Sequence, residues 1–146
     1  MAAYDLQVVD EGATLADAHA VRRRVFIDEQ GVPEAVEMDD RDDAATHVVA
    51  HEADDGAPVG TARVRTLDDE TAKIERVAVL PDERGNGLGA QLMVRAEAVA
   101  REQGCRRVRL HAQVAVESFY QRLGYQTVSE TFDQAGIEHV EMTKSL

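Results

Sequence analysis

The sequence predicts a mixed α/β (α+β) fold, in which a central β-sheet carries helices on both faces. Strand-like and helix-like segments follow one another in the order β-α-β-β-β-α-β-α-β-β, and adjacent strands interrupted by helices are typical of a mixed sheet. The chain has 146 residues, and 44% of them are hydrophobic. This length and composition suit one compact domain over residues 1–146.

The expected strands are short segments rich in β-branched residues and bounded by turn residues. They span residues 4–9, 47–53, 58–66, 73–80, 107–111, 125–129 and 136–143. Turns at 54–57 and 67–70 join three of them into a meander, and Pro81 ends the last strand of that meander.

Three helices are predicted from apolar residues at helical spacing. The first begins at the Ser/Thr-x-x-acid pattern of Thr14 and Asp17 and runs to about Glu29, before Gly31 and Pro33. The second covers 88–103 and has one apolar stripe, formed by Leu88, Leu92, Ala96, Val99 and Ala100. The third covers 115–123, with Phe119 and Leu123 one turn apart. The acidic segment 34–45 lacks periodicity and is expected to be a loop or a short irregular helix.

The charge of the chain is strongly negative. The formal net charge is -12, and Lys73 and Lys144 are the only lysines. An acidic, lysine-poor surface is tolerated where dense counterions screen its self-repulsion, so composition favours a salt-adapted host over an ordinary acidic protein. Non-specific nucleic-acid binding is disfavoured, because it needs a basic surface.

Nothing in the sequence predicts a membrane or secreted protein. No apolar run is long enough to span a bilayer, and the N-terminus lacks the pattern of a signal peptide. Cys105 is the only cysteine, so it forms no intramolecular disulfide and is expected to be a small buried residue. A cytoplasmic location is the expectation.

The segment 73–90 is the most informative part of the chain. A strand enters a glycine-rich turn, and a helix leaves it. Glycines let the backbone approach a ligand closely, and the first amide groups of a helix have no intrahelical partner. The helix dipole adds to their attraction for an anion. The segment therefore predicts a site for a phosphate or diphosphate, against the alternative of a plain turn.

Two familiar glycine loops do not fit. A P-loop requires Gly-Lys-Ser/Thr, which Gly89-Ala90-Gln91 lacks. The pattern Gly85-x-Gly87-x-x-Ala90 nominally matches a dinucleotide fingerprint, but residues 81–84 separate it from the strand. The next strand also ends at His111 instead of at an acidic residue.

The chain resembles the GNAT superfamily of N-acetyltransferases. The segment Arg84-Gly85-Asn86-Gly87-Leu88-Gly89, behind a strand and Pro81, is similar to the family's Gln/Arg-x-x-Gly-x-Gly/Ala motif. Phe119-Tyr120-Gln121-Arg122-Leu123-Gly124-Tyr125 resembles its Phe-Tyr-x-x-x-Gly-Phe/Tyr element. The segments 25–30 and 111–113 further resemble an uncharacterised subgroup of small bacterial members.

The resemblance implies acetyl-CoA as co-substrate and no metal. Backbone groups of Val77, Ala78 and Val79 would pair with the pantetheine arm, and the Val79 N–H would polarise the thioester carbonyl. Gln113 stands where many members have an asparagine. Diphosphate contacts would come from Arg84 and from the backbone of Gly85, Asn86, Gly87, Leu88, Gly89 and Ala90.

The resemblance also implies catalytic roles. Tyr120 would protonate the leaving thiolate, the alternative being a packing tyrosine. Glu75 would act as general base, because a protonated amine cannot attack a thioester. This interpretation places Glu75 on the same strand face as Val77 and Val79. The alternative is that Glu75 is a rim carboxylate paired with Lys73 or Arg63. Glu29 or His111 could then serve as the base.

The acceptor side is less defined. Arg22-Arg23-Arg24 is interpreted as a solvated helix face bordering the acceptor site, and the acidic segment 34–43 as a feature that could attract a cationic amine. The predicted activity is direct transfer of acetyl to a small-molecule or protein amine. A non-catalytic acyl-CoA sensor and a structural domain without a CoA site stay as alternatives. Dimers are common in the resembled family, so a homodimer is an expectation.

Overall fold

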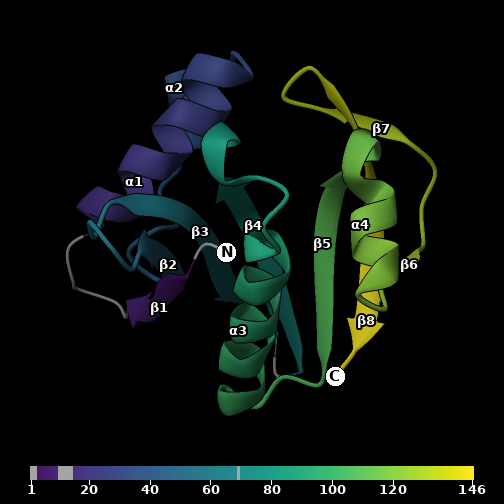
Figure 1. Cartoon of the computed structure of the whole chain (residues 1–146). Helices are drawn as coiled ribbons and strands as arrows, with labels where there is room; N and C mark the ends of the chain where they lie inside the picture. Colours follow the sequence, from purple (N-terminus) through teal and green to yellow (C-terminus); the bar gives the residue numbers. More distant parts are fainter. Residues whose placement is uncertain (1–2, 10–14, 69) are drawn as a thin grey trace.

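The computed structural model describes residues 3–9, 15–68 and 70–146 of the chain. Its strands form one mixed sheet in the order β1-β2-β3-β4-β5-β8-β6, and β7 pairs with β8 (Figure 1). The strands are β1 (Tyr4–Val9), β2 (Thr46–Glu52), β3 (Pro58–Thr66), β4 (Thr71–Val79), β5 (Arg107–Gln113), β6 (Gln126–Thr127), β7 (Phe132–Gln134) and β8 (Ile137–Ser145). The helices are α1 (Ala16–Arg22), η1 (Arg23–Glu29), α2 (Glu34–Glu37), η2 (Pro81–Glu83), α3 (Leu88–Glu102), η3 (Val114–Val116) and α4 (Glu117–Arg122).

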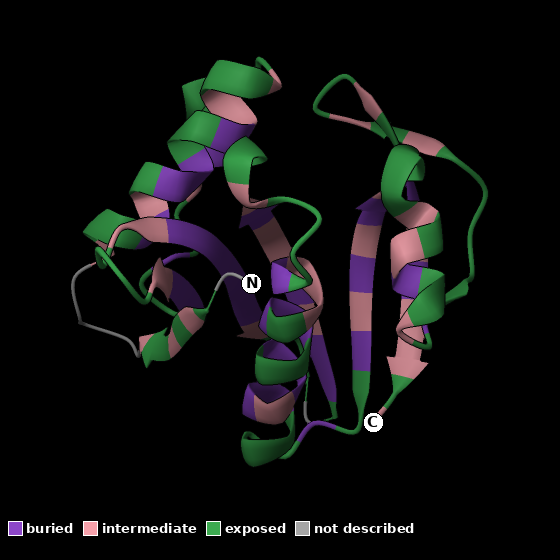
Figure 2. Ribbon diagram, viewed as in Figure 1, coloured by how far each residue is buried: buried purple, intermediate pink, exposed green. Residues whose placement is uncertain are grey.

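Helices cover both faces of the sheet, as predicted. The main core lies under α3, whose stripe of Leu88, Leu92 and Ala96 is fully buried against β2, β3 and β4. On the opposite face, Val21 and Val25 of α1 and η1 pack on Ala78 of β4. Buried residues follow the sheet and the inner side of α3 in Figure 2. None of the described helices is long and apolar enough to cross a membrane.

The predicted elements are present, with two main differences, the π-helix that continues the first helix and the additional strand β7. The first helix changes to a π-helix at Arg23, where the Gln30 N–H bonds the carbonyl of Val25 five residues earlier. The segment 34–45 forms the short helix α2 and then turns, as expected of a loop or a short irregular helix. Strand β7 was not predicted. The proposed helix start at Thr14 lies outside the described residues.

A bulge in β4 changes which side chains share a face. Thr61 of β3 pairs with Ala78, but Arg63 pairs with Glu75, so two residues of β4 stand opposite one of β3. Arg76 takes up the extra residue at φ 55°, in the left-handed region that non-glycine residues rarely adopt. The alternation of side chains between the two faces of the sheet is therefore interrupted at Arg76, and residues an even number of positions apart across the bulge lie on opposite faces.

Strands β4 and β5 are paired over three positions only. Thr71, Ala72 and Lys73 lie parallel to Arg107, Val108 and Arg109, and no further pairs continue toward the carboxyl ends. The two ribbons diverge in that direction in Figure 1. On its other edge, β4 stays paired with β3 as far as Val79. The backbone edge of β4 that faces β5 is thus free of strand partners beyond Lys73.

Candidate functional site

A cavity of about 440 Å³ opens where β4 and β5 diverge. It is lined by the carboxyl half of β4, by β5, by η1 and α2, by α4 and by the β7–β8 hairpin. Of the residues predicted to form the site, it brings together Glu75, Val77, Ala78, Val79, Arg84, Gln113 and Tyr120. Residues 85–90 do not line the cavity but lie next to it in the chain.

The glycine turn has the geometry of an anion cradle. Gly85 and Gly87 have φ of 87° and 81°, and Gly87 stands just before α3 as its N-cap, where no side chain binds the first amide groups of the helix. The amides of Leu88, Gly89 and Ala90 come before Gln91, whose N–H is the first to donate within the helix, to the Gly87 carbonyl at 3.2 Å. A Cβ on Gly89 would lie 3.2 Å from Cζ of Phe119, so the glycine lets α3 and α4 approach. Asn86 donates from Nδ2 to the Tyr4 hydroxyl at 3.1 Å.

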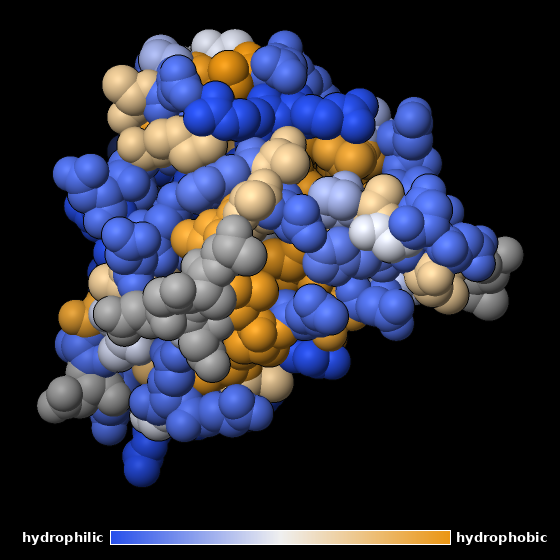
Figure 3. Space-filling model, turned by 90° about the vertical axis from the view of Figure 1, so that its left-hand side faces the viewer, coloured by the Kyte–Doolittle hydropathy of each residue, from blue (hydrophilic) through white to orange (hydrophobic). Residues whose placement is uncertain are grey.

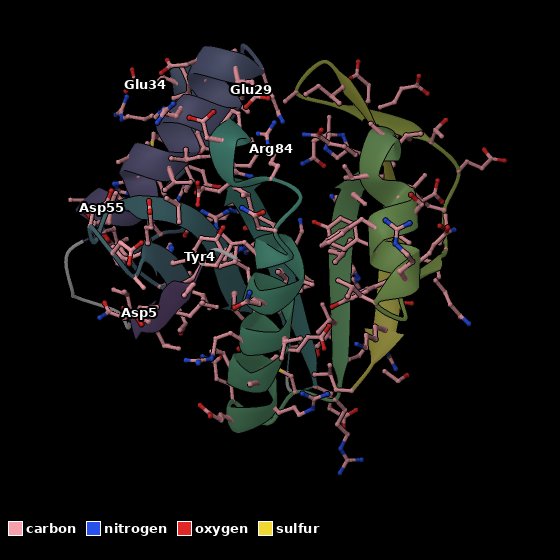
Figure 4. All side chains as sticks on the ribbon, in the orientation of Figure 1. Tyr4, Asp5, Glu29, Glu34, Asp55 and Arg84 are labelled. Carbon is pink, nitrogen blue, oxygen red and sulfur yellow. The ribbon has the colours of Figure 1, made fainter. Side chains whose placement is uncertain are left out.

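Arg84 lies at the edge of the cavity and holds two segments together. Its guanidinium donates to both carboxylate oxygens of Glu29 at 2.8 and 2.7 Å, and its Nε donates to the Val79 carbonyl at 3.0 Å. Figure 4 shows Glu29 and Arg84 pointing toward one another. The hydrogen bond from Arg84 lowers the pKa of Glu29. Arg84 thus hydrogen-bonds the Val79 carbonyl, one of the backbone groups expected to bind the pantetheine arm.

Tyr120 is the most buried residue of α4, with 8% of its surface exposed. Its ring packs edge-on against Phe119 and Tyr125. Burial raises its pKa to about 12, so the phenol keeps its proton throughout the neutral range. Its hydroxyl has no hydrogen-bond partner in the described part of the chain. A protonated donor at the cavity wall is what a general acid requires.

Glu75 does not lie on the face expected for it. Because of the bulge at Arg76, Glu75 shares the face of Arg63, whereas Val79 shares the opposite face with Gly60 and packs toward α3. The assumption that Glu75, Val77 and Val79 share one face is therefore wrong.

The Glu75 carboxylate is also surrounded by cations. It accepts hydrogen bonds from Arg63 and Arg65, and Lys73 Nζ lies 3.4 Å away. Burial alone would raise its pKa, but the bond from Arg65 and the charge of Arg63 outweigh burial and lower the pKa to about 2. A carboxylate held in this way is a weak base.

A buried ionic network continues from Glu75 beneath α1 and α2. Arg22 is fully buried and donates to Glu37 at 2.5 Å and to Asp42 at 2.7 Å, and Arg63 binds Asp39 and Asp42. The interpretation of the arginine run as a solvated face is therefore wrong for Arg22. The carboxylates of the acidic segment are largely occupied by these arginines, which weakens the idea that they attract a cationic amine.

Two residues of the site were missed from the sequence. His139 of β8 and Gln134 of β7 line the cavity beside His111 and Gln113. They reach it through a two-residue turn in which Ala135 and Gly136 both have positive φ. Alanine at such a position is unusual, so the turn gave little signal. Gln113 itself donates to Gln30 Oε1 of the facing segment at 3.0 Å.

Comparison with known proteins agrees with this geometry. Residues 7–146 match the Acetyltransferase (GNAT) domain family. The uncharacterized N-acetyltransferase YjcF of Bacillus subtilis is 37% identical over 131 residues, which are 89% of this chain and 91% of that protein.

Solved structures share the fold. An acyl-CoA N-acyltransferase from Pseudomonas aeruginosa is 30% identical with a TM-score of 0.82, over 97% of this chain and 99% of that one. A GNAT family acetyltransferase from Elizabethkingia anophelis with acetyl-CoA bound has a TM-score of 0.70 at 14% identity, over 98% of each chain. By its family match over nearly the whole chain and by these relatives, this protein belongs to the GNAT acetyltransferase family.

Proposed function

We propose that this protein transfers an acetyl group from acetyl-CoA directly to an amine, without a covalent enzyme intermediate. The observation that carries the proposal is the divergence of β4 from β5 beside the glycine turn. It leaves an unpaired strand edge and a protonated tyrosine at one cavity, and the free amides of the glycine turn lie next to that cavity in the chain. The family match supports the same activity.

On this proposal, successive segments of the chain bind successive parts of acetyl-CoA. The free edge of β4 at Val77–Val79 takes the pantetheine arm as an added strand, and the Val79 N–H faces the thioester carbonyl. The amides of residues 85–90 hold the diphosphate. Arg84 supplies a charge-assisted contact to the diphosphate after it leaves Glu29.

The acceptor would enter from the side of η1 and α2. There the cavity wall carries Glu37 and Glu75, but both carboxylates are ion-paired, and Lys73 and Arg76 stand beside them. The wall is therefore close to electrically balanced, so it selects no strongly cationic acceptor by charge alone. Its apolar part comes from Val25, Phe26 and Val36.

The first test is a thermal melt with and without millimolar acetyl-CoA, with NAD and ATP as controls, in dilute and in molar salt. A ligand at about a hundred times its dissociation constant stabilises a protein by roughly 2.7 kcal/mol. A shift with acetyl-CoA but not with NAD or ATP supports the proposal. No shift in any salt that keeps the protein folded would contradict it.

One observation favours the acyl-CoA sensor as a second candidate. The carboxylate expected to act as base is bound by two arginines, so the described site lacks that base in a free form. A sensor would bind acetyl-CoA yet transfer nothing to a panel of amines, and its slow background hydrolysis would not change in a Tyr120→Phe variant. Measurable transfer that depends on Tyr120 would exclude it.

A further inference from the structure

The tautomer of the neutral His139 ring is fixed by a backbone hydrogen bond. Its Nδ1 lies 2.7 Å from the carbonyl oxygen of Ile137. A carbonyl can only accept, so Nδ1 carries the proton, and in the neutral ring Nε2 is left with a free lone pair. Nε2 has no hydrogen-bond partner within the residues that the structure describes. His139 as a residue is 7% exposed, and it lines the cavity.

His111 is less suited to accept a proton. Its Nδ1 lies 2.8 Å from Gln134 Oε1, and its Nε2 lies 3.4 Å from Glu141. Both ring nitrogens thus face oxygen atoms of other side chains. Of the two histidines in the cavity wall, His139 is the one with an unengaged nitrogen.

The sheet places His139 opposite Tyr120. His139 pairs with Gln113 across β5 and β8, and neighbouring Val140 and Ala112 point into the core under α3 and α4. His139 therefore lies on the face of η1 and α2. Tyr120 packs into the core on the other face, yet both residues line the same cavity. The cavity passes through the split sheet with one of these groups on each side.

We propose that His139 is the general base that deprotonates the acceptor amine, an assignment that rests on the proposed function. Its Nε2 takes one proton from the ammonium form of the acceptor, and the freed lone pair of the nitrogen attacks the thioester carbonyl carbon. When the carbon–sulfur bond breaks, the sulfur leaves with the electron pair and takes the proton of Tyr120. The second proton of the nitrogen restores the phenol, and His139 releases its proton to solvent.

Several charged groups share the cavity with His139 and set its electrostatic surroundings. They are Lys73, Glu75 and Arg76 of β4, Glu37 of α2, His111 of β5 and Arg84 of the glycine turn, with Glu141 and Glu138 near it on β8. Of these, Glu37 and Glu75 are ion-paired with arginines. None of the eight hydrogen-bonds or ion-pairs with the His139 ring, whose contacts are the Ile137 carbonyl and the stacked ring of Phe132.

The test compares His139→Gln with His111→Gln and the unchanged protein, using benzylamine and aniline as acceptors at neutral pH. Benzylamine is protonated there and needs a base, whereas aniline is already neutral. A lost general base costs about 100-fold in rate. We expect His139→Gln to lose about that factor in kcat/KM with benzylamine and little with aniline. The deficit of His139→Gln in kcat/KM with benzylamine should become smaller as the pH rises from about 7 to about 9, because solvent then deprotonates more of the amine.

Equal losses with both amines would mean a structural role, and a selective loss in His111→Gln alone would assign the base to His111. Either result overturns the proposal. A long-range proton–nitrogen NMR spectrum provides a test that needs no acceptor, because a proton found on Nε2 of the neutral ring also overturns it. Acetyl-CoA binding, measured by thermal shift, should be equal in all three proteins. Failure of the unchanged protein to bind it would contradict the proposed function instead.

Discussion

Tyr120 combines deep burial of its ring with a hydroxyl that lines the cavity and has no hydrogen-bond partner in the described chain, so the phenol is available to a ligand. In Tyr120→Phe, kcat should fall about 100-fold, since the general acid is gone, while the affinity for acetyl-CoA changes little. Turnover and thermal shift measure the two effects.

Tyr125→Phe is a matched control for that variant. It also removes a buried hydroxyl beside α4, but one that donates to Glu97 at 2.8 Å, away from the cavity wall. This control should lose stability and keep its turnover number. An unchanged rate in Tyr120→Phe would remove Tyr120 from the mechanism.

Gly87 stands at φ 81° with nothing within 4 Å of the position that a Cβ would take. In Gly87→Val, the turn should leave this conformation, because a β-branched residue is strained there. Binding of acetyl-CoA should then be lost while the sheet stays intact. Gly56→Val is the matched control, since Gly56 has φ 73° and equally open surroundings in the β2–β3 turn. Equal affinity in both variants would contradict the role of the glycine turn.

At the scale of elements, Arg22 connects α1 to α2 and to the turn after it. In Arg22→Met, Glu37 and Asp42 would each lose a buried partner and keep only Arg76 and Arg63, so the free energy of unfolding should fall by about 3 kcal/mol, the lower end of the range for a broken buried ion pair. Arg23→Met is the control, because the Arg23 side chain is half exposed and pairs with exposed Glu34. Urea denaturation of both variants measures the difference. A similarly small fall in the free energy of unfolding in both variants would mean that the buried ionic network contributes little to stability.

The same network should make the protein sensitive to acid. The pKa of Glu75 is lowered from 4.5 to about 2 in the folded state. Its contribution to stability is thus fully present above about pH 4.5 and is lost as the pH falls toward 2. The urea midpoint of the unchanged protein should fall across that window more steeply than that of Glu75→Gln. Parallel curves would show that the carboxylate titrates normally.

Sequence reasoning located the elements better than it located the side chains. The helical stripe of α3 and the alternation of the strands reflect local spacing, and both predicted the structure well. The bulge at Arg76 and the π-turn after Arg22 depend on tertiary contacts, since buried arginines and their carboxylates fix both segments. Glu75 and Arg22 were misplaced for this reason, and His139 was missed because its hairpin gave no clear signal.

At the scale of the whole molecule, negative charge dominates. Acidic residues number 28 against 16 lysines and arginines, and the face in Figure 3 is mostly hydrophilic. The melting temperature should rise between about 0.1 M and 2 M KCl, because the screening length drops from about 10 Å to below 3 Å. Thermal melts at several KCl concentrations measure this. The gain should shrink at mildly acidic pH, where carboxylates lose charge. A melting temperature that falls with salt would show that screening weakens the buried ion pairs more than it relieves repulsion.

The short contact between β4 and β5 has a consequence for the protein in a cell. Three paired positions join the two strands, and beyond them a bound acetyl-CoA would supply the missing cross-links between the halves of the sheet. On the proposed function, molecules without acetyl-CoA would open more readily and be degraded sooner. The amount of this protein in a cell would then follow the supply of acetyl-CoA.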